Sequence, residues 1–214
     1  MSDSSEDESF NGINRLHLRV SDYLEEVRRY LRVTRAQRIL RRYFTMNAFD
    51  GAMTSLGVAI GAYITDITDP KAVIGVIIVG AIAMAISGFS GTYMTESAER
   101  SKALDEIEEA MLMDLEDTIY GHASRFVSIF SGIVDGSAPF MASIPTVLPF
   151  ALAHLELLPL RMAFFASIGA ALATLFLLGV FLGRISKSNI IYSGVKMVIA
   201  GISVALLALF LNGV

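Results

Sequence analysis

Residues 44–64, with the sequence FTMNAFDGAMTSLGVAIGAYI, decide the fold class of this chain. A helix needs about 20 predominantly apolar residues to cross a bilayer, and this stretch is long enough. Its one charged residue is Asp50. The stretch therefore predicts a first transmembrane helix that carries a carboxylate in its interior.

Four further apolar segments follow, so the sequence predicts five transmembrane helices. The chain is 54% hydrophobic, whereas soluble domains are roughly 45–50% apolar, and its charges gather in residues 1–42 and 96–125. No alternating strand pattern occurs. The predicted fold class is an all-α polytopic membrane protein. We place its helices at about 43–65, 71–95, 126–151, 160–183 and 192–213.

Lys and Arg are distributed unevenly over the predicted loops. If all five helices cross the membrane, 15 of the 17 lie on the side of the N-terminus, and Lys71 and Arg161 lie on the other side. Positively charged loops stay in the cytoplasm. The N-terminus is therefore expected in the cytoplasm. The compact chain without evident organelle signals favours a prokaryotic cell membrane, or a vacuolar membrane if the protein is eukaryotic.

The residues before the first apolar segment are polar. Residues 1–12 are acidic and are expected to form a disordered tail. Residues 13–42 place apolar side chains at helical spacing among nine Arg, which predicts an amphipathic helix on the cytoplasmic membrane face or on the protein. A nucleic-acid interface is disfavoured, because the run adjoins a membrane span and anionic lipid head groups account for the arginines.

Two carboxylates lie deep in apolar segments. Asp50 should lie about 10 Å below the membrane surface, where an ionisable group costs about 2.5–3.5 kcal/mol and usually serves transport. Met53, at helical spacing, would offer a soft sulfur beside the hard carboxylate oxygens. Alternatively, Asp50 caps a helix that begins at Gly51. Asp135 in the third apolar segment is the second deep carboxylate.

The second apolar segment is made largely of small residues between Gly80 and Gly91, which permits close helix approach in lipid. Met84 is a large side chain left pointing out of this surface. Close packing explains the pattern, and a narrow path lined by Met84 is the functional alternative.

A short internal repeat links the first and third apolar segments. FDGAM at 49–53 and VDGSA at 134–138 each open a predicted hairpin of two helices. A parallel duplication with a fifth helix added would produce this pattern, as would chance. The third segment also contains three prolines, which kink a helix and leave carbonyls free: Pro139, Pro145 and Pro149.

An acidic sequence follows the second segment without a helix breaker, so this helix should continue into the cytoplasm, within an acidic helical region at 96–125. Nine carboxylates fall between 96 and 117, several of them at i, i+3 spacing on one face. Stacked carboxylates repel each other unless cations lie between them. A solvated acidic helix is the alternative, but below a span with Asp50 we favour divalent cations. The predicted ligands are Glu96, Glu99, Glu106, Glu109, Met113 and Glu116.

The sequence contains few features that would indicate an enzyme. The chain has no cysteine, and its three histidines form no HxH or HExxH pair. There is no nucleophile elbow and no Gly-rich phosphate loop. We therefore expect no enzyme and no resident cofactor. Oxygen ligands with an occasional Met favour Fe²⁺ or Mn²⁺ as the bound cation.

Five motifs in order resemble the vacuolar iron transporter family, which includes the yeast calcium/manganese/iron vacuolar transporter. They are DG at 50–51, GAIAMAISGF at 80–89, ESAE and EIEE between 96 and 109, IPTVLPFAL at 144–152, and ASIGAALATLFLLG at 166–179. The resemblance covers about residues 40–213. It implies a homodimer of five-helix protomers, a cation path near the first helices, and cytoplasmic carboxylates that collect metal.

By position, the resemblance implies that Asp50 is the family's intramembrane acid and that Met84 is the Met of its second span. Glu96, Glu99, Glu106 and Glu109 resemble the paired glutamates of the family's cytoplasmic helices. This sequence departs from the family at Val76, where many members carry a Glu. Its cytoplasmic region is also short, so the family's Met-plus-Glu arm is represented at most by Met113, Glu116 or Asp117.

The sequence hypothesis is a transporter for Fe²⁺ or Mn²⁺ that moves the cation out of the cytoplasm in exchange for protons. Asp50 or Asp135 would be the proton-linked carboxylate. The alternative is a membrane-bound metal sensor or adaptor that binds cation without moving it, which the loss of a Glu at Val76 favours. A membrane enzyme with a di-metal site is weakened, because no Glu-x-x-His motif occurs.

Overall fold

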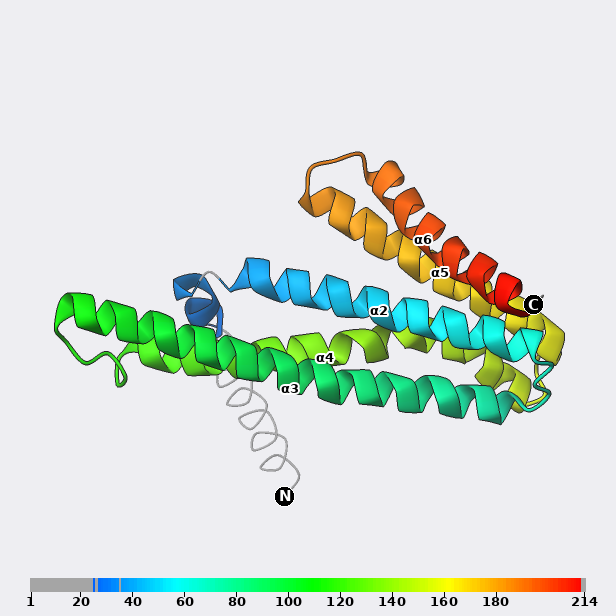
Figure 1. Ribbon diagram of the computed structural model, residues 1–214, viewed down its shortest axis with the longest axis horizontal. Coiled ribbons are helices and arrows are strands. Elements are labelled where there is room, and N and C mark those ends of the chain that lie inside the picture. The colour runs from blue at the N-terminus through cyan, green and yellow to red at the C-terminus, as the bar shows by residue number, and fades with distance from the viewer. Residues whose placement is uncertain (1–24, 26, 35, 213–214) are drawn as a thin grey trace, which may run out of the picture. The chain divides into compact units, whose positions relative to one another are not determined.

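The computed structural model describes residues 25, 27–34 and 36–212 of the chain. These residues are helical apart from turns and short loops, and no strand occurs among them. The expectation of an all-α fold is therefore confirmed. The long helices are α2 (Gln37–Ile64), α3 (Pro70–Met111), α4 (Ile119–His154), α5 (Leu160–Ile185) and α6 (Ile190–Asn212) (Figure 1).

Four of these helices, α3 to α6, are long and apolar enough to cross a membrane, and they make the chain a multi-pass integral membrane protein. α2 is a continuous helix of 28 residues, but polar residues such as Asn47 and Asp50 lower its hydropathy, and it is not among the four. Since Asp50 lies inside α2, the alternative in which it caps a helix starting at Gly51 is wrong.

The helix boundaries differ from the predicted segments in the two polar regions of the chain, residues 13–42 and residues 96–125. Residues 27–33 are helical, a turn includes Thr34 and Ala36, and α2 begins at Gln37, so residues 37–42 are the first turns of α2. The predicted tail 1–12 and the first part of the predicted helix 13–42 lie outside the described residues. α3 contains both an apolar and an acidic part, and residues 119–125 belong to α4.

The chain divides into two compact units. One contains residues 94–130 together with the described residues up to Arg38, and the other contains residues 39–93 and 131–212. In the first unit, the rings of Tyr30 and Phe126 lie 5.4 Å apart, and Phe126 stacks on Phe130 at 5.6 Å.

The turn between α3 and α4 uses acidic side chains as hydrogen-bond acceptors. Leu112 adopts a left-handed backbone conformation with φ of 53°. The backbone N–H of Leu115 donates to Glu108 Oε1 over 2.7 Å, and the N–H of Glu116 donates to Asp114 Oδ1 over 2.9 Å. Part of the acidic sequence at 96–117 therefore fixes the backbone of this turn.

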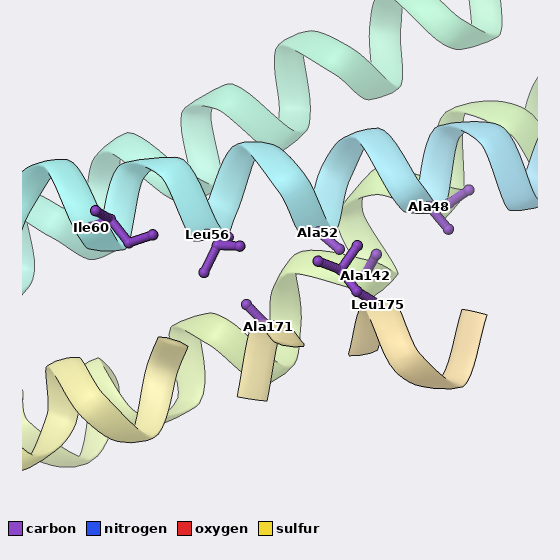
Figure 2. Close-up of a cluster of buried hydrophobic side chains, with 8 residues drawn as sticks. Ala48, Ala52, Leu56, Ile60, Ala142, Ala171 and Leu175 are labelled. Carbon is purple, nitrogen blue, oxygen red and sulfur yellow. The ribbon is translucent and has the colours of Figure 1, made fainter. Parts of the chain in front are cut away.

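In the second unit, α2 packs on α4 and α5 through alanines and a few larger aliphatic side chains (Figure 2). The α2 contacts recur every fourth residue, so they lie on one face of the helix. Small residues let helix backbones approach closely where lipid supplies no hydrophobic driving force. This cluster contains Ala48, Ala52, Leu56 and Ile60 of α2, Ala138 and Ala142 of α4, and Ala171 and Leu175 of α5.

α4 is the most enclosed helix among the four candidate spans. Its apolar window is 56% buried, whereas that of α6 is 11% buried. α5 and α6 pack side by side as a hairpin (Figure 1). The outer helices expose apolar side chains, as contact with hydrocarbon requires, and α4 is the helix on which an interior site can be built.

Two glycines of α4 allow α3 to contact it through the backbone. A Cβ atom added at Gly136 would lie 2.5 Å from the carbonyl oxygen of Ala85, and one at Gly132 would lie 2.9 Å from that of Phe89. These distances are too short for any side chain.

We predict that Gly136→Ala destabilises the protein by about 1–3 kcal/mol, because the added methyl group forces α3 and α4 apart. Thermal unfolding of the purified protein in detergent measures the effect. Gly80→Ala is the matched control, since a Cβ at Gly80 meets no atom within 4 Å. Equal unfolding midpoints for the two variants would contradict the close packing described here.

Candidate functional site

The candidate site is centred on the carboxylate of Asp135, which is only 2% exposed. The side-chain amide of Asn47 on α2 donates to Asp135 Oδ1. The hydroxyl of Thr92 on α3 donates to Asp135 Oδ2 over 2.6 Å. Three helices therefore meet at one buried acidic group.

Small residues on α3 make room for this carboxylate. Gly88 and Thr92 are four residues apart and lie on the same face of α3. A Cβ atom at Gly88 would lie 3.2 Å from Asp135 Oδ2, so a larger residue would crowd the carboxylate. Gly136, next to Asp135, contacts the same helix. The small-residue surface of this segment serves the site as well as the packing.

Asp50 lies close to Asp135. It follows Asn47, which bonds to Asp135, by three residues, so both lie on the same face of α2 one helical turn apart. In contrast to Asp135, Asp50 is exposed on the surface of the single chain. A Cβ at Gly51 would collide with the backbone of Pro139, so α2 and α4 also touch here. The two DG dipeptides of the internal repeat thus lie on neighbouring helices at the same site.

The two predicted path methionines occupy different surroundings. Met53 is partly buried and packs against the apolar cluster of α2, α4 and α5. Met84 is half-buried on α3, one turn before Gly88, and so lies on the face of α3 that meets Asp135. Of the two, Met84 is the one aligned with the acidic site.

The predicted cytoplasmic ligands lie in the first unit, and three of them form ion pairs. Glu96 is 2% exposed and pairs with Arg100 over 2.9 Å. Glu106 lies 3.9 Å from Lys102, and Glu116 lies 3.3 Å from Arg125. The other predicted ligands, Glu99, Glu109 and Met113, are exposed.

These side chains do not converge on one point in the single chain. Among the residues that the structure describes, no group of three or more His, Asp or Glu is placed to hold a metal ion. A cation at the acidic end of α3 would therefore have to displace Arg or Lys from the glutamates, or draw on ligands from a second copy.

Two residues that bond to Asp135, Asn47 and Thr92, were not among the candidates that the sequence predicts. Their signals were weak: Asn47 precedes Asp50 by one helical turn, and Thr92 continues the small-residue face of α3 by one turn after Gly88. Neither spacing reveals which carboxylate the side chain will meet.

The fold and this site define a class: a multi-pass integral membrane protein with a hydrogen-bonded carboxylate buried among its helices. The chain belongs to the family of "Uncharacterized protein MJ0645" from the archaeon Methanocaldococcus jannaschii. The two are 33% identical over 175 residues, which cover 80% of this chain and 87% of the relative. No protein-family model matches the chain, and no solved structure matches it.

We predict that Thr92→Val destabilises the protein by about 1.5–3 kcal/mol, because it removes a hydrogen bond to a buried carboxylate at almost constant side-chain volume. Chemical unfolding in detergent measures the loss. Thr68→Val, in the loop after α2, is the control, since Thr68 is exposed and should change stability little. A Thr92→Val protein as stable as wild type would show that this bond contributes nothing.

Proposed function

We propose that the protein transports a divalent cation, Fe²⁺ or Mn²⁺, out of the cytoplasm in exchange for protons. One observation carries the proposal: a carboxylate that is only 2% exposed, Asp135, is held by hydrogen bonds from α2 and α3 among the helices of a membrane protein, next to the turn of α2 that carries Asp50. Ionisable residues at such positions are costly and mark ion pathways in membrane proteins. The proposal agrees with the resemblance of the motifs around Asp50 and Met84 to vacuolar iron transporters.

The exposure of Asp50 supports a homodimer. On a lone protomer this carboxylate would face hydrocarbon, at a cost of about 2.5–3.5 kcal/mol. A second copy that places its own Asp50 opposite would remove both from lipid. The pair would then supply hard oxygen ligands, which divalent cations prefer. Met84 would add a soft contact that favours iron over calcium.

The acidic end of α3 would collect the cation before transport. α3 has 42 residues, about 63 Å of helix, roughly twice the thickness of the hydrocarbon core. Its acidic half therefore extends beyond the bilayer, on the cytoplasmic side in the five-span topology. Glu96, Glu106 and Glu116 would exchange their Arg and Lys partners for a divalent cation there.

The proposed topology requires α2 to cross the membrane as well, which adds a fifth span to α3, α4, α5 and α6. The chain lacks cysteine, so single cysteines can report the side of the membrane at each position. We predict that Ser5→Cys and Thr68→Cys react with an impermeant maleimide from opposite sides of sealed vesicles, because α2 separates them. Ser188→Cys should react from the same side as Ser5→Cys. Labelling of Ser5→Cys and Thr68→Cys from one side would mean that α2 does not cross.

Flux through the purified protein in liposomes tests the function. Wild type should move Mn²⁺ and Fe²⁺ faster when a pH gradient drives protons across the membrane in the direction opposite to the cation. Asp50→Asn should reduce the rate by about tenfold or more, equivalent to ~1.4 kcal/mol in the barrier. Asp66→Asn, a change at an exposed turn residue, is the control and should transport normally. Undiminished flux in Asp50→Asn would remove Asp50 from the path.

The second candidate function is a membrane-bound metal sensor or adaptor. The ion pairs at the acidic end of α3 favour it, because a cation bound there would release Arg100, Lys102 and Arg125 to contact a partner. Val76, an exposed apolar residue where many vacuolar iron transporters carry a Glu, also fits a protein that does not exchange protons. Cation binding without any flux in the liposome experiment would favour the sensor.

A further inference from the structure

Asp135 is not the only polar group buried on α4. Ser131, Asp135, Ser143 and Thr146 form what we name the α4 polar face, and they are 0%, 2%, 4% and 0% exposed. Their spacing keeps them on one side of the helix over about 22 Å. Hydroxyl groups buried between membrane helices usually bond to a neighbouring helix or to a backbone carbonyl.

Ser131 departs from this pattern. Its hydroxyl is fully buried, yet it has no hydrogen-bond partner among the described residues. It precedes Asp135 by four residues, so it lies one turn away on the same face of α4. A buried hydroxyl without a partner costs roughly 1–3 kcal/mol. Its position beside a carboxylate suits a water molecule or a proton in transit.

The partners of Asp135 suit both of its protonation states. The Thr92 hydroxyl can donate to a carboxylate or accept from a carboxylic acid. The Asn47 amide can present its NH₂ group or, after rotation, its carbonyl oxygen. No Lys or Arg in the described part of the chain pairs with Asp135 to hold it ionised. Asp135 can therefore gain or lose a proton and keep both hydrogen bonds.

The same enclosure disfavours a metal ion at Asp135. Both carboxylate oxygens are already bonded, and Gly88 is held close to Oδ2. Divalent cations such as Mg²⁺ and Ca²⁺ take six or more oxygen ligands, which need space. A proton needs no such additional space. Asp50, which is exposed, has the space that Asp135 lacks.

We propose that Asp135 binds the proton that is exchanged for the cation, while Asp50 contacts the cation. This inference rests on the proposed transport function. A proton taken up by the Asp135 carboxylate forms an O–H bond and neutralises one negative charge, and its release restores that charge. No other bond changes.

Repulsion between the two carboxylates supplies the coupling. Asp50 is the titratable group of α2 that lies one turn from Asn47, the α2 partner of Asp135, while Gly88 and Thr92 of α3 and Ser131 of α4 are uncharged. A cation at Asp50 favours the ionised form of Asp135. By reciprocity, a proton on Asp135 weakens cation binding at Asp50. Exchange of one ion for the other follows from this linkage.

The α4 polar face gives the proton a route to Asp135. Pro139 has no N–H, so the backbone carbonyl of Asp135 lacks its helical partner. The hydroxyl of Ser143 donates to the carbonyl of Phe140 over 2.9 Å. Farther along, Ser55 of α2 donates to Thr146 Oγ1 over 3.2 Å, and Ser167 of α5 donates to the carbonyl of Thr146 over 2.8 Å. Water molecules would complete the chain between these groups.

Infrared difference spectroscopy of the protein in liposomes tests proton binding without transport. On acidification, wild type should show the C=O band of a protonated buried carboxyl group, and Asp135→Asn should lack it. Addition of Mn²⁺ at constant pH should reduce the band in wild type but not in Asp50→Asn. A band that persists in Asp135→Asn, or that Mn²⁺ does not change in wild type, would overturn the inference.

Flux separates this inference from the proposed function. Asp135→Asn should still move Mn²⁺ down its own gradient but lose the acceleration by a pH gradient, and Asp135→Glu should recover part of it. A wild type that moves no cation would defeat the proposed function itself. A wild type that transports, with an Asp135→Asn variant that responds equally to pH or no longer binds Mn²⁺, would defeat only the role assigned to Asp135.

Ser131→Ala is a second, milder test, because it removes one hydroxyl from the α4 polar face. It should slow pH-driven Mn²⁺ exchange several-fold while leaving Mn²⁺ binding unchanged. Ser137→Ala, on the exposed side of α4, is the matched control and should exchange at the wild-type rate. Equal pH-driven rates for the two variants would exclude Ser131 from the route.

Discussion

The burial of one carboxylate among α2, α3 and α4 is the constraint on which the rest of the second unit depends. An ionisable group in a low-dielectric interior is tolerated only when polar partners surround it. Asn47 and Thr92 supply those partners from two different helices. Both helices must therefore approach α4 closely and in one register. The glycines at 51, 88, 132 and 136 make that approach possible, because each lies where a side chain would meet a neighbouring helix or the carboxylate.

This arrangement gives the two deep carboxylates unequal environments. Asp135 is enclosed and each of its carboxylate oxygens accepts a hydrogen bond, whereas Asp50 lies on the surface of the chain. Two acidic groups of the same chemistry can hold different ions when one site has room for a hydrated or multiply coordinated cation and the other has room only for a proton. In the proposed transporter, the division of labour thus follows from packing density, because the residue type is the same at both positions.

Apolar segment length was sufficient to predict the helices, and the deep positions of Asp50 and Asp135 were sufficient to select them as candidates. The partners of Asp135 were not predictable, because they depend on how α2 and α3 are oriented about their axes relative to α4. The periodicity of side chains along one helix does not determine that orientation. The helix starts at Gln37 and Ile119 were also missed, since polar residues hide a helix from a hydropathy pattern. Likewise, the ion pairs of Glu96, Glu106 and Glu116 depend on side-chain placement that i, i+3 counting of carboxylates ignored.

α4 combines deep burial with three prolines, at 139, 145 and 149. Each proline removes one backbone hydrogen bond and one source of helical stiffness. In most soluble domains the best-packed element is also the most rigid one. Here the central helix has fewer internal bonds than its neighbours, so the bundle should be mechanically more compliant at its centre than at its lipid-facing edge. Small movements of the helix that carries Asp135 would then need little distortion of the surrounding helices.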